Sequence, residues 1–519
     1  HPRFVPEVVR STEQFPQIAN GAQFPLYVVE TDLAVFAAQL AAVDMSAVFD
    51  SGRVMFFCGP EAWEELTAFF IDHPWRALPF SPDGRPVVTL VRPDETPKAQ
   101  AFFAAAWGHR QKALTSAVKD MAVHYPAAGN ELRDRRLKTL FGKWFDGVQA
   151  LYQSGGVLNT TAETSEMLAA LEKQTGISIA SPSRPQLPDK VRVLFMVSVF
   201  TTVLRHVIED IAQALRRLGH ETRIVKEPSA MDRLYPTAVV SALSEFKPDM
   251  IFQMDHLRRE WPWVPKGIPH LTFIQDMVPA LLQEHAGQSI GPNDFVLVDT
   301  EFKWWQEAFD RYRYPRQNFI HFPSCTNEET FKPSELSESD RAKYGSDVAV
   351  TTNIDLVPAR AWETSVVENL RGFSHARLRD AMVYDMFQTV ANAFYRLTPL
   401  EWLAPLGLDI KIWGKFPQET HPTLGKYFVG PAGFEELPKI YQASRITILG
   451  NHAGWRHYKT ASVLASGGLP LVRFHPDSCE DIVDRETMMF KGPDDLREKV
   501  RYWLSHEEAR LNEVRKWRA

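Results

Sequence analysis

Short apolar runs alternate with helical stripes along much of the chain. Residues 191–197, Val-Arg-Val-Leu-Phe-Met-Val, are almost continuously apolar, which is typical of a parallel strand buried on both faces. Apolar positions three and four apart then predict a helix that ends at Gly219. Further short apolar runs predict strands at 222–225, 250–253, 271–274, 295–298 and 319–322. Together they indicate a doubly wound α/β domain that ends near residue 340.

The same alternation continues to the end of the chain. Strands are predicted at 348–351, 409–413, 427–429, 445–449, 469–473 and 488–490. Helices are predicted at about 378–396, 435–443, 456–466, 494–504 and 506–517. Open α/β sheets bind ligands at the carboxyl ends of their strands, so two such domains are expected to face each other across a ligand-binding cleft.

The first part of the chain also alternates between strands and helices. Strands are predicted at 26–30, 54–57 and 86–91, and helices at 32–42, 60–71, 97–121, 131–153 and 163–174. Three prolines in Ser-Pro-Ser-Arg-Pro-Gln-Leu-Pro then indicate a linker. We therefore predict an N-terminal α/β accessory domain (1–180), a linker (181–189), a second α/β domain (190–340) and a third α/β domain with C-terminal helices (341–519).

Composition narrows the class of protein. The 519 residues carry a net charge of −6 and are 45% apolar, which favours a folded globular chain and argues against a general nucleic-acid binder. No apolar run is long enough to predict a transmembrane segment. The three cysteines lie far apart, which favours thiols in a reducing compartment, and the start has no signal-peptide pattern. A cytoplasmic protein is expected.

Several familiar chemical motifs are absent from the sequence. It contains no P-loop, no G-x-G-x-x-G and no H-E-x-x-H. It also lacks Asp-x-Asp, which disfavours a transferase that holds a sugar nucleotide through a metal ion, and its 16 histidines show no metal-ligand spacing. We expect no metal site.

A set of segments in the second and third blocks resembles GT-B glycosyltransferases. They keep the family's order and spacing over about residues 190–505, and they are most similar to the CgeB-like, family-1-type bacterial enzymes. The segments are Phe246–Phe252, Lys266–Asp276, Phe295–Thr300, Phe331–Pro333, Ile412–Lys415, Ile440–Ile448 and Thr460–Pro470. The resemblance implies two Rossmann-like domains facing a cleft, with a nucleotide sugar such as a UDP-sugar as the donor substrate and no separate cofactor. It implies a glycan or protein acceptor, such as flagellin or a surface glycan.

The predicted helix 456–466 is the expected donor site. Its N-terminus offers N–H groups and a positive dipole end to a diphosphate, and Arg456, His457 and Lys459 add positive charge there. A solvated helix start is the alternative. Lys415, which follows Gly414, is expected to reach the same phosphates unless it is an exposed loop lysine.

The resemblance adds further residues to the donor pocket: Asn353, His452, Gly454, Thr460 and Ser462. Ser462 stands where the family usually has a glutamate that holds the ribose hydroxyls. A serine bonds a hydroxyl singly and without charge assistance.

Two residues are candidates for the chemistry on the acceptor side. Asp276 follows a predicted strand, where a carboxylate can activate an acceptor hydroxyl, and a helix cap is its alternative role. His256 follows another strand beside Asp255, and a structural acid–base pair is the alternative there.

Two other functions fit the same sequence. A sugar-nucleotide epimerase shares the two-domain architecture, and a non-catalytic binding or scaffold protein would explain the serine at 462. The segment Tyr27–Asp32 weakly resembles the opening of N-terminal domains in some bacterial glycosyltransferases and flagellin-modification proteins. We therefore expect the N-terminal domain to recognise the acceptor or to form a homo-oligomer.

Overall fold

A computed structural model gives the fold. It describes the following residues: 4–13, 25–76, 94–124, 190–199, 204–229, 231–232, 234, 236–261, 264–276, 278, 280–282, 285–298, 303–322, 325–353, 392–415, 421, 423–450, 454–475 and 483–518. Several predicted features lie outside these residues: the strand at 86–91, the helices at 131–153 and 163–174, the linker at 181–189 and most of the helix at 378–396.

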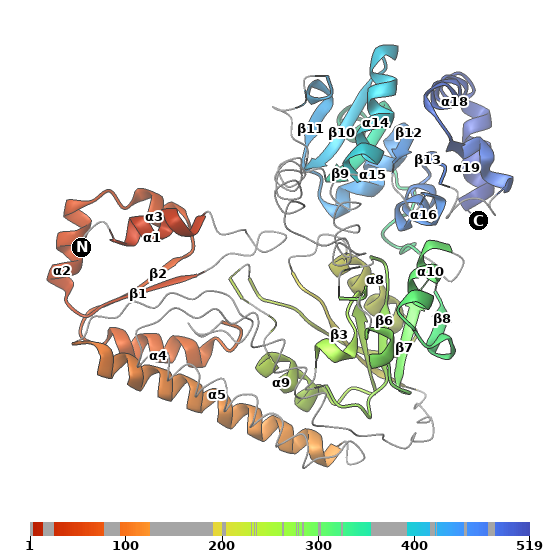
Figure 1. Cartoon of the computed structure of the whole chain (residues 1–519). Helices are drawn as coiled ribbons and strands as arrows, with labels where there is room; N and C mark the ends of the chain where they lie inside the picture. The colour runs from red at the N-terminus through yellow and green to blue at the C-terminus, as the bar shows by residue number, and fades with distance from the viewer. Residues whose placement is uncertain are drawn as a thin grey trace, which may run out of the picture. The chain divides into compact units, whose positions relative to one another are not determined.

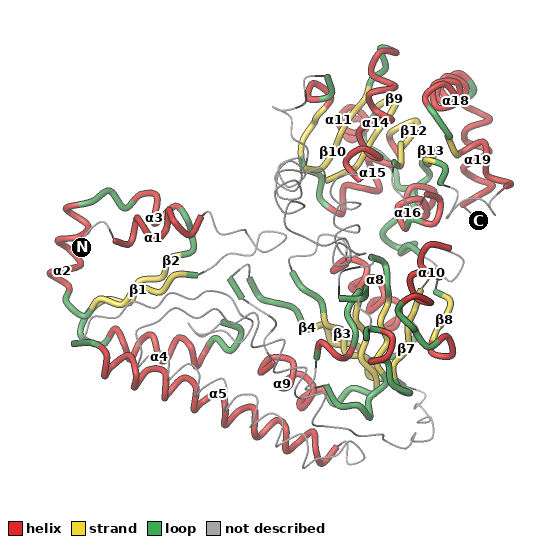
Figure 2. The backbone as a smooth tube through the Cα atoms, in the orientation of Figure 1, coloured by secondary structure: helices red, strands yellow, loops and turns green. Residues whose placement is uncertain are grey.

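The middle of the chain forms a six-stranded sheet in the order β4-β3-β5-β6-β7-β8 (Figure 2). Each pairing whose register is described is parallel. The strands are β3 (Arg192–Met196), β4 (Glu221–Val225), β5 (Met250–Met254), β6 (His270–Phe273), β7 (Asp294–Val298) and β8 (Phe319–His321). All six agree with the predicted strands to within one or two residues.

A second six-stranded parallel sheet has the order β11-β10-β9-β12-β13-β14. Its strands are β9 (Ser346–Asn353), β10 (Ile410–Lys415), β11 (Phe428–Gly430), β12 (Ser444–Leu449), β13 (Pro470–Arg473) and β14 (Met489–Phe490). Two parallel sheets with helices between their strands confirm the predicted α/β class with Rossmann-like domains.

The helices follow the predicted alternation, with two differences in the last domain. The predicted helix 378–396 does not end at 396, because α14 continues to Leu403; the predicted helix 456–466 begins two residues later, after a 3₁₀ turn. The described α-helices are α1 (Phe4–Glu13), α2 (Leu33–Ala42), α3 (Ser46–Asp50), α4 (Ala62–Asp72), α5 (Thr96–His124), α8 (Leu204–Arg217), α9 (Pro236–Phe246), α10 (Lys303–Arg311), α11 (Glu338–Tyr344), α14 (Asn392–Leu403), α15 (Leu437–Ala443), α16 (Tyr458–Ala465), α18 (Pro493–Ser505) and α19 (Glu507–Arg518). No helix within the described ranges is both long and apolar enough to cross a membrane.

The N-terminal part pairs β1 (Leu26–Glu30) with β2 (Val54–Cys58) in parallel and packs α4 along α5 (Figure 1). The far end of α5 joins a different core. Its Leu114, Ala117 and Met121 are buried in one apolar cluster with Leu243 of α9 and Ile251 of β5. α5 is therefore a shared element that covers the middle sheet as well as the N-terminal strands.

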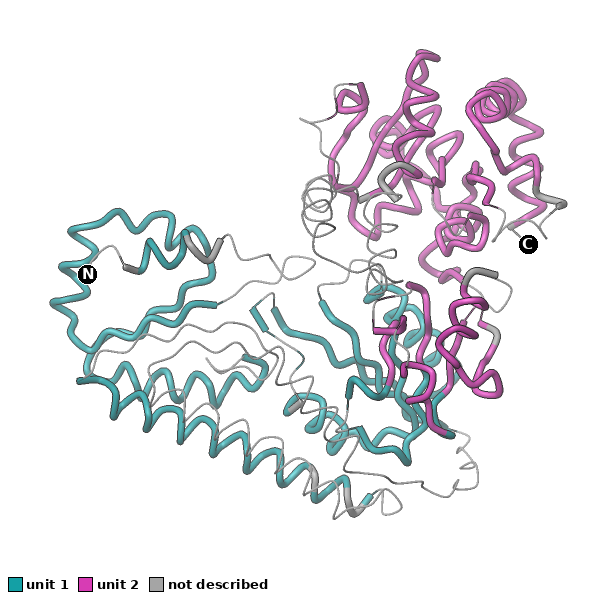
Figure 3. The backbone as a smooth tube through the Cα atoms, in the orientation of Figure 1, with its two compact units in different colours: residues 1–254, 258–271, 292–294 teal, residues 255–257, 272–291, 295–519 magenta. Residues whose placement is uncertain are grey.

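The chain divides into two compact units (Figure 3). The first comprises residues 1–254, 258–271 and 292–294, and the second comprises 255–257, 272–291 and 295–519. All the donor-side candidates and both catalytic candidates belong to the second unit. The predicted division into three domains and a linker stays a prediction.

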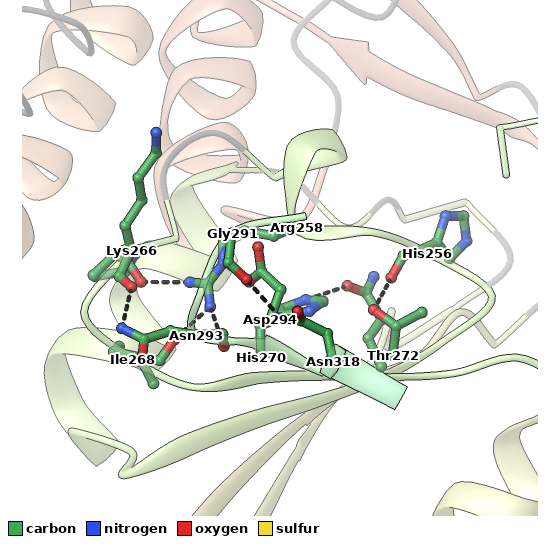
Figure 4. Close-up of polar contacts among 12 residues, drawn as sticks. His256, Arg258, Lys266, Ile268, His270, Thr272, Gly291, Asn293, Asp294 and Asn318 are labelled. Atoms are coloured by element: carbon green, nitrogen blue, oxygen red, sulfur yellow. Dashed lines mark hydrogen bonds and ion pairs between the residues drawn. The ribbon is translucent and has the colours of Figure 1, made fainter. Parts of the chain in front are cut away.

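In the first unit, a buried guanidinium ties together the loops that precede β6 and β7 (Figure 4). Arg258 is 8% exposed and donates to the Asp294 carboxylate. It also donates to three main-chain carbonyls, those of Pro265 (2.6 Å), Ile268 (2.5 Å) and Asn293 (3.3 Å). Because Asp294 is buried as well, the guanidinium gives its carboxylate a charge-assisted partner.

We expect Arg258→Ala to lower the free energy of unfolding by about 3–5 kcal/mol, because it leaves the Asp294 charge buried without its partner. Denaturant unfolding measures the loss. The double variant Arg258→Met, Asp294→Leu removes both charges and should recover part of it. Equal losses for the single and double variants would show that the ion pair is not the source of the stability.

Candidate functional site

The donor-side residues predicted on β9 and β10 lie at neighbouring strand ends. Gly414 pairs with Thr352, and Lys415 pairs with Asn353, the last residue of β9. Gly414 has a φ of 119°, a conformation that favours glycine, and the Lys415 side chain is exposed. The structure thus brings three of the predicted residues, Asn353, Gly414 and Lys415, to one carboxyl edge of the sheet.

A 3₁₀ turn and a capped helix follow β12 at the same edge. Gly454 starts the turn with a φ of 54°, and Arg456 ends it. His457 is the N-cap of α16, and its Nδ1 accepts the Lys459 N–H at 3.2 Å, while its carbonyl accepts the Thr460 N–H at 2.9 Å. These N–H groups therefore have partners within the chain. His457 caps the helix, and its contact with a phosphate stays a prediction.

The side chain of Lys459 is held against β9. Its Nζ donates to the Thr351 carbonyl at 2.9 Å. Burial, and to a smaller extent the positive charge of Arg396, lower the pKa of the Lys459 ammonium to about 7. Near neutral pH the site is consequently poised between a charged and a neutral lysine.

Arg396 reaches this edge from α14. A Cβ on Gly450, just after β12, would lie 2.0 Å from the Tyr395 carbonyl oxygen, so only glycine permits the loop and the helix to approach this closely. Burial lowers the pKa of the Arg396 guanidinium, opposed by the negative charges of Tyr458 and Asp276. The close approach at Gly450 therefore brings a second cation beside Lys459.

Tyr458 completes this group of polar side chains. Burial raises the pKa of its hydroxyl, and the charge of Asp276 acts in the same direction while that of Arg396 opposes it. Arg396 thus interacts electrostatically with Asp276, Tyr458 and Lys459, and Tyr458 also interacts with Asp276. All four belong to the same compact unit.

The two predicted residues farther along α16 are buried. Thr460 is 2% exposed, and its hydroxyl oxygen has no hydrogen-bond partner among the described residues. Ser462 is 1% exposed; its hydroxyl pairs with the Thr326 hydroxyl at 2.9 Å and donates to the Tyr458 carbonyl at 3.1 Å. Ser462 therefore anchors the first turn of the helix, and its contact with a ribose stays a prediction.

On the acceptor side, Asp255 links the two candidate residues. It follows β5 with a φ of 56° and is 2% exposed. Its Oδ1 accepts the N–H groups of Gln275 (2.7 Å) and Asp276 (2.9 Å), whereas its Oδ2 is buried without a partner in the described part of the chain. His256 and Asp276 are both exposed at the surface beside it.

The environment of Asp255 disfavours its charge. Burial raises the pKa of its carboxyl to about 8, with a further rise from the negative charge of Asp276. The two accepted N–H groups and His256 oppose this rise. Asp255 is therefore mainly protonated at neutral pH.

The structure gives no position for His452 and no candidate group of metal ligands among the described residues. His452 lies outside the described residues. Within the described ranges, no group of three or more histidine, cysteine, aspartate or glutamate residues could hold a metal ion.

Comparison with known proteins identifies one domain. Residues 396–519 match the family model of a glycosyl transferase-like domain. The match confirms the predicted resemblance to glycosyltransferases for this part of the chain. No curated protein sequence matches the chain.

Several solved structures are similar to the chain at low identity. WaaG, a glycosyltransferase involved in lipopolysaccharide biosynthesis, is 14% identical with a TM-score of 0.39, over 63% of this chain and 94% of that one. Sucrose-phosphate synthase from Thermosynechococcus elongatus is 12% identical with a TM-score of 0.36, over 63% and 98%. HepE from Anabaena, solved in complex with UDP, is 10% identical with a TM-score of 0.34, over 62% and 90%.

Sequence reasoning missed Arg396, and it left Asp255 with His256 as either an acid–base candidate or a structural pair. Arg396 was predicted to end a helix, and no motif marks it, since its importance depends on the close approach at Gly450. The position of Asp255 directly after a buried strand was a usable signal, because this is where parallel sheets place functional groups. Its burial could not be read from the pattern.

The shifted pKa of Lys459 has a measurable effect on stability. Because its pKa falls from 10.5 in the unfolded chain to about 7 in the fold, its contribution is complete above pH 10.5 and is lost as the pH falls toward 7. Lys459→Met removes this loss. We expect the variant's melting temperature to exceed that of the wild type, without ligand, by several degrees at pH 7 and by much less at pH 10.5.

Thermal unfolding followed by circular dichroism across this range tests the expectation. Lys439→Met is the matched control, because its Nζ pairs with the Asp340 carboxylate instead. A difference between Lys459→Met and wild type that does not change with pH would rule out a buried, titrating lysine.

Proposed function

We propose that this glycosyltransferase moves a sugar from a nucleotide-sugar donor to an acceptor hydroxyl without a metal ion. One observation carries the proposal: Lys459 and Arg396 lie close together, partly buried, at the carboxyl edge of the sheet in the domain that matches the family. Two neighbouring cations cost free energy unless an anion joins them. A diphosphate supplies this charge.

On the donor side, the cations act on the leaving group. As the bond between the anomeric carbon and the diphosphate breaks, negative charge grows on the phosphate oxygen, and positive groups fixed nearby stabilise it. Lys459 is protonated when the diphosphate binds, since the anion raises its pKa again. In this proposal, Lys415 and the backbone at Gly414 border the same site.

The transfer step needs a proton acceptor. The acceptor oxygen forms a bond to the anomeric carbon, the electron pair of the broken C–O bond stays on the diphosphate, and the hydroxyl proton passes to the Asp276 carboxylate. Two features of Asp276 support this role: its exposed side chain and its electrostatic interaction with Arg396. His256, exposed on the neighbouring loop, is proposed to contact the acceptor.

The acceptor is proposed to be a glycan or a protein, recognised with the help of the N-terminal domain or of an oligomer formed through it. Apolar side chains on its surface support such a contact: Leu33 is 56% exposed, Leu40 is 41% exposed and Phe49 is 54% exposed.

The donor proposal predicts binding of nucleotide sugars in the presence of a metal chelator. Calorimetry with UDP-, GDP-, CMP- and dTDP-sugars should find a donor whose affinity falls at least tenfold in Lys459→Met and in Arg396→Met, because each variant removes one phosphate contact. Binding at pH 8 should also take up protons, through Lys459.

Lys439→Met again serves as the control and should bind like the wild type, since it lies in an ion pair outside the site. If no nucleotide sugar binds, or if binding needs a divalent metal, the donor proposal is wrong. If binding is the same in all three variants, the cations do not form the site.

The acid–base proposal predicts that Asp276→Asn lowers kcat by about 100-fold or more and leaves the donor affinity within a few fold, because the amide cannot take the proton. Product analysis with donor alone separates the alternative function: an epimerase converts the sugar without any acceptor. A variant with wild-type kcat would exclude Asp276 as the base.

A further inference from the structure

We propose that Asp255 is a positioning residue for the transfer reaction: its buried carboxyl holds the main chain of Gln275 and Asp276 and so places the Asp276 carboxylate. This inference rests on the proposed function, because it acts through Asp276. The family match does not include Asp255, and the sequence analysis considered it only together with His256, not as a support for Asp276.

The geometry shows a carboxyl used as a main-chain clamp. One oxygen accepts two consecutive N–H groups, at 2.7 Å and 2.9 Å, in the bend that follows β6. β5 and β6 are neighbours in the sheet, so the clamp fixes the end of one strand to the loop of the next. A residue 2% exposed and held in this way has little freedom to move.

The conformation of Asp255 itself is unusual. Its φ of 56° lies in the left-handed region, which non-glycine residues adopt rarely, and aspartate is among those that tolerate it. Strain of this kind persists only where the surroundings fix it, and it is concentrated at functional sites. Here it turns the carboxyl back toward the bend at 275–276.

The second oxygen makes the residue sensitive to charge. Oδ2 is buried without a partner among the described residues, so in an ionised Asp255 this oxygen would be charged and without a hydrogen bond among them. Because Oδ1 is occupied by the two N–H groups, the proton resides on Oδ2. Ionisation at higher pH places a second negative charge beside Asp276 and weakens the arrangement.

Other charged groups near this pair titrate as well and must be separated from it. His256 faces Asp255 from its own loop, and Asp276 faces it from the loop after β6. Arg396 and Tyr458 influence Asp276 from α14 and α16, and Lys459 lies beside Arg396. Measuring kcat at saturating donor isolates Asp255, since the bound diphosphate keeps Lys459 protonated.

Two substitutions at Asp255 separate its acceptor oxygen from its charge. Asp255→Asn keeps an oxygen for the two N–H groups and cannot ionise, so we expect kcat at pH 7 within about threefold of wild type and no fall above pH 8. Asp255→Val removes the acceptor, so we expect kcat to drop about 10- to 100-fold with donor affinity unchanged. Thr272→Val is the control, because it removes a different hydrogen bond between β6 and the loop after β5, from the Thr272 hydroxyl to the His256 carbonyl.

Hydrogen exchange at the Gln275 and Asp276 amides tests the clamp without any activity. Exchange should accelerate in Asp255→Val and stay slow in Asp255→Asn and Thr272→Val. Slow exchange in Asp255→Val, equal kcat in both Asp255 variants, or a fall above pH 8 that persists in Asp255→Asn overturns the proposal. If the wild type shows slow exchange but transfers no sugar, the proposed function fails while the clamp itself stands.

Discussion

The free-energy cost of holding Lys459 and Arg396 close together is the constraint on which the donor site depends. In water two such cations repel weakly, whereas in a low-dielectric interior the repulsion and the loss of hydration both grow. The fold fixes them there by ordinary means, with Lys459 on a carbonyl of β9 and α14 drawn close at Gly450. In the proposed function, the two cations are thus in place before the diphosphate of the donor binds.

On the proposed acceptor side, burial disfavours a negative charge in the same way as it disfavours the positive charge of Lys459. Asp255 is buried in its neutral form, so it provides an oxygen for two N–H groups without adding charge next to Asp276. An ionised carboxyl in that place would repel Asp276 and, in the proposed reaction, the departing phosphate. Burial thus favours the neutral forms of both Lys459 and Asp255. A charged group that binds nearby would change the pKa of each.

The sequence predicted the strands well because parallel strands buried on both faces are short, continuous apolar runs. It predicted the start of α16 less well, because the 3₁₀ turn at Gly454–Arg456 continues into the helix with similar residues. It did not predict the partners of Lys459 or the role of Asp255. Those depend on which loops meet, and this information lies in tertiary contacts rather than in periodicity.

Ser462 shows how a departure from the family pattern changes which residues are available to contact the donor. Where related enzymes have a glutamate, the hydroxyl here pairs with Thr326 and holds the Tyr458 carbonyl, which anchors the turn that presents Lys459. A buried glutamate at that position would need a charged or hydroxyl-bearing partner to be stable. In the proposed function, recognition of the donor therefore rests more on the diphosphate and the two cations than on a charged contact to the ribose.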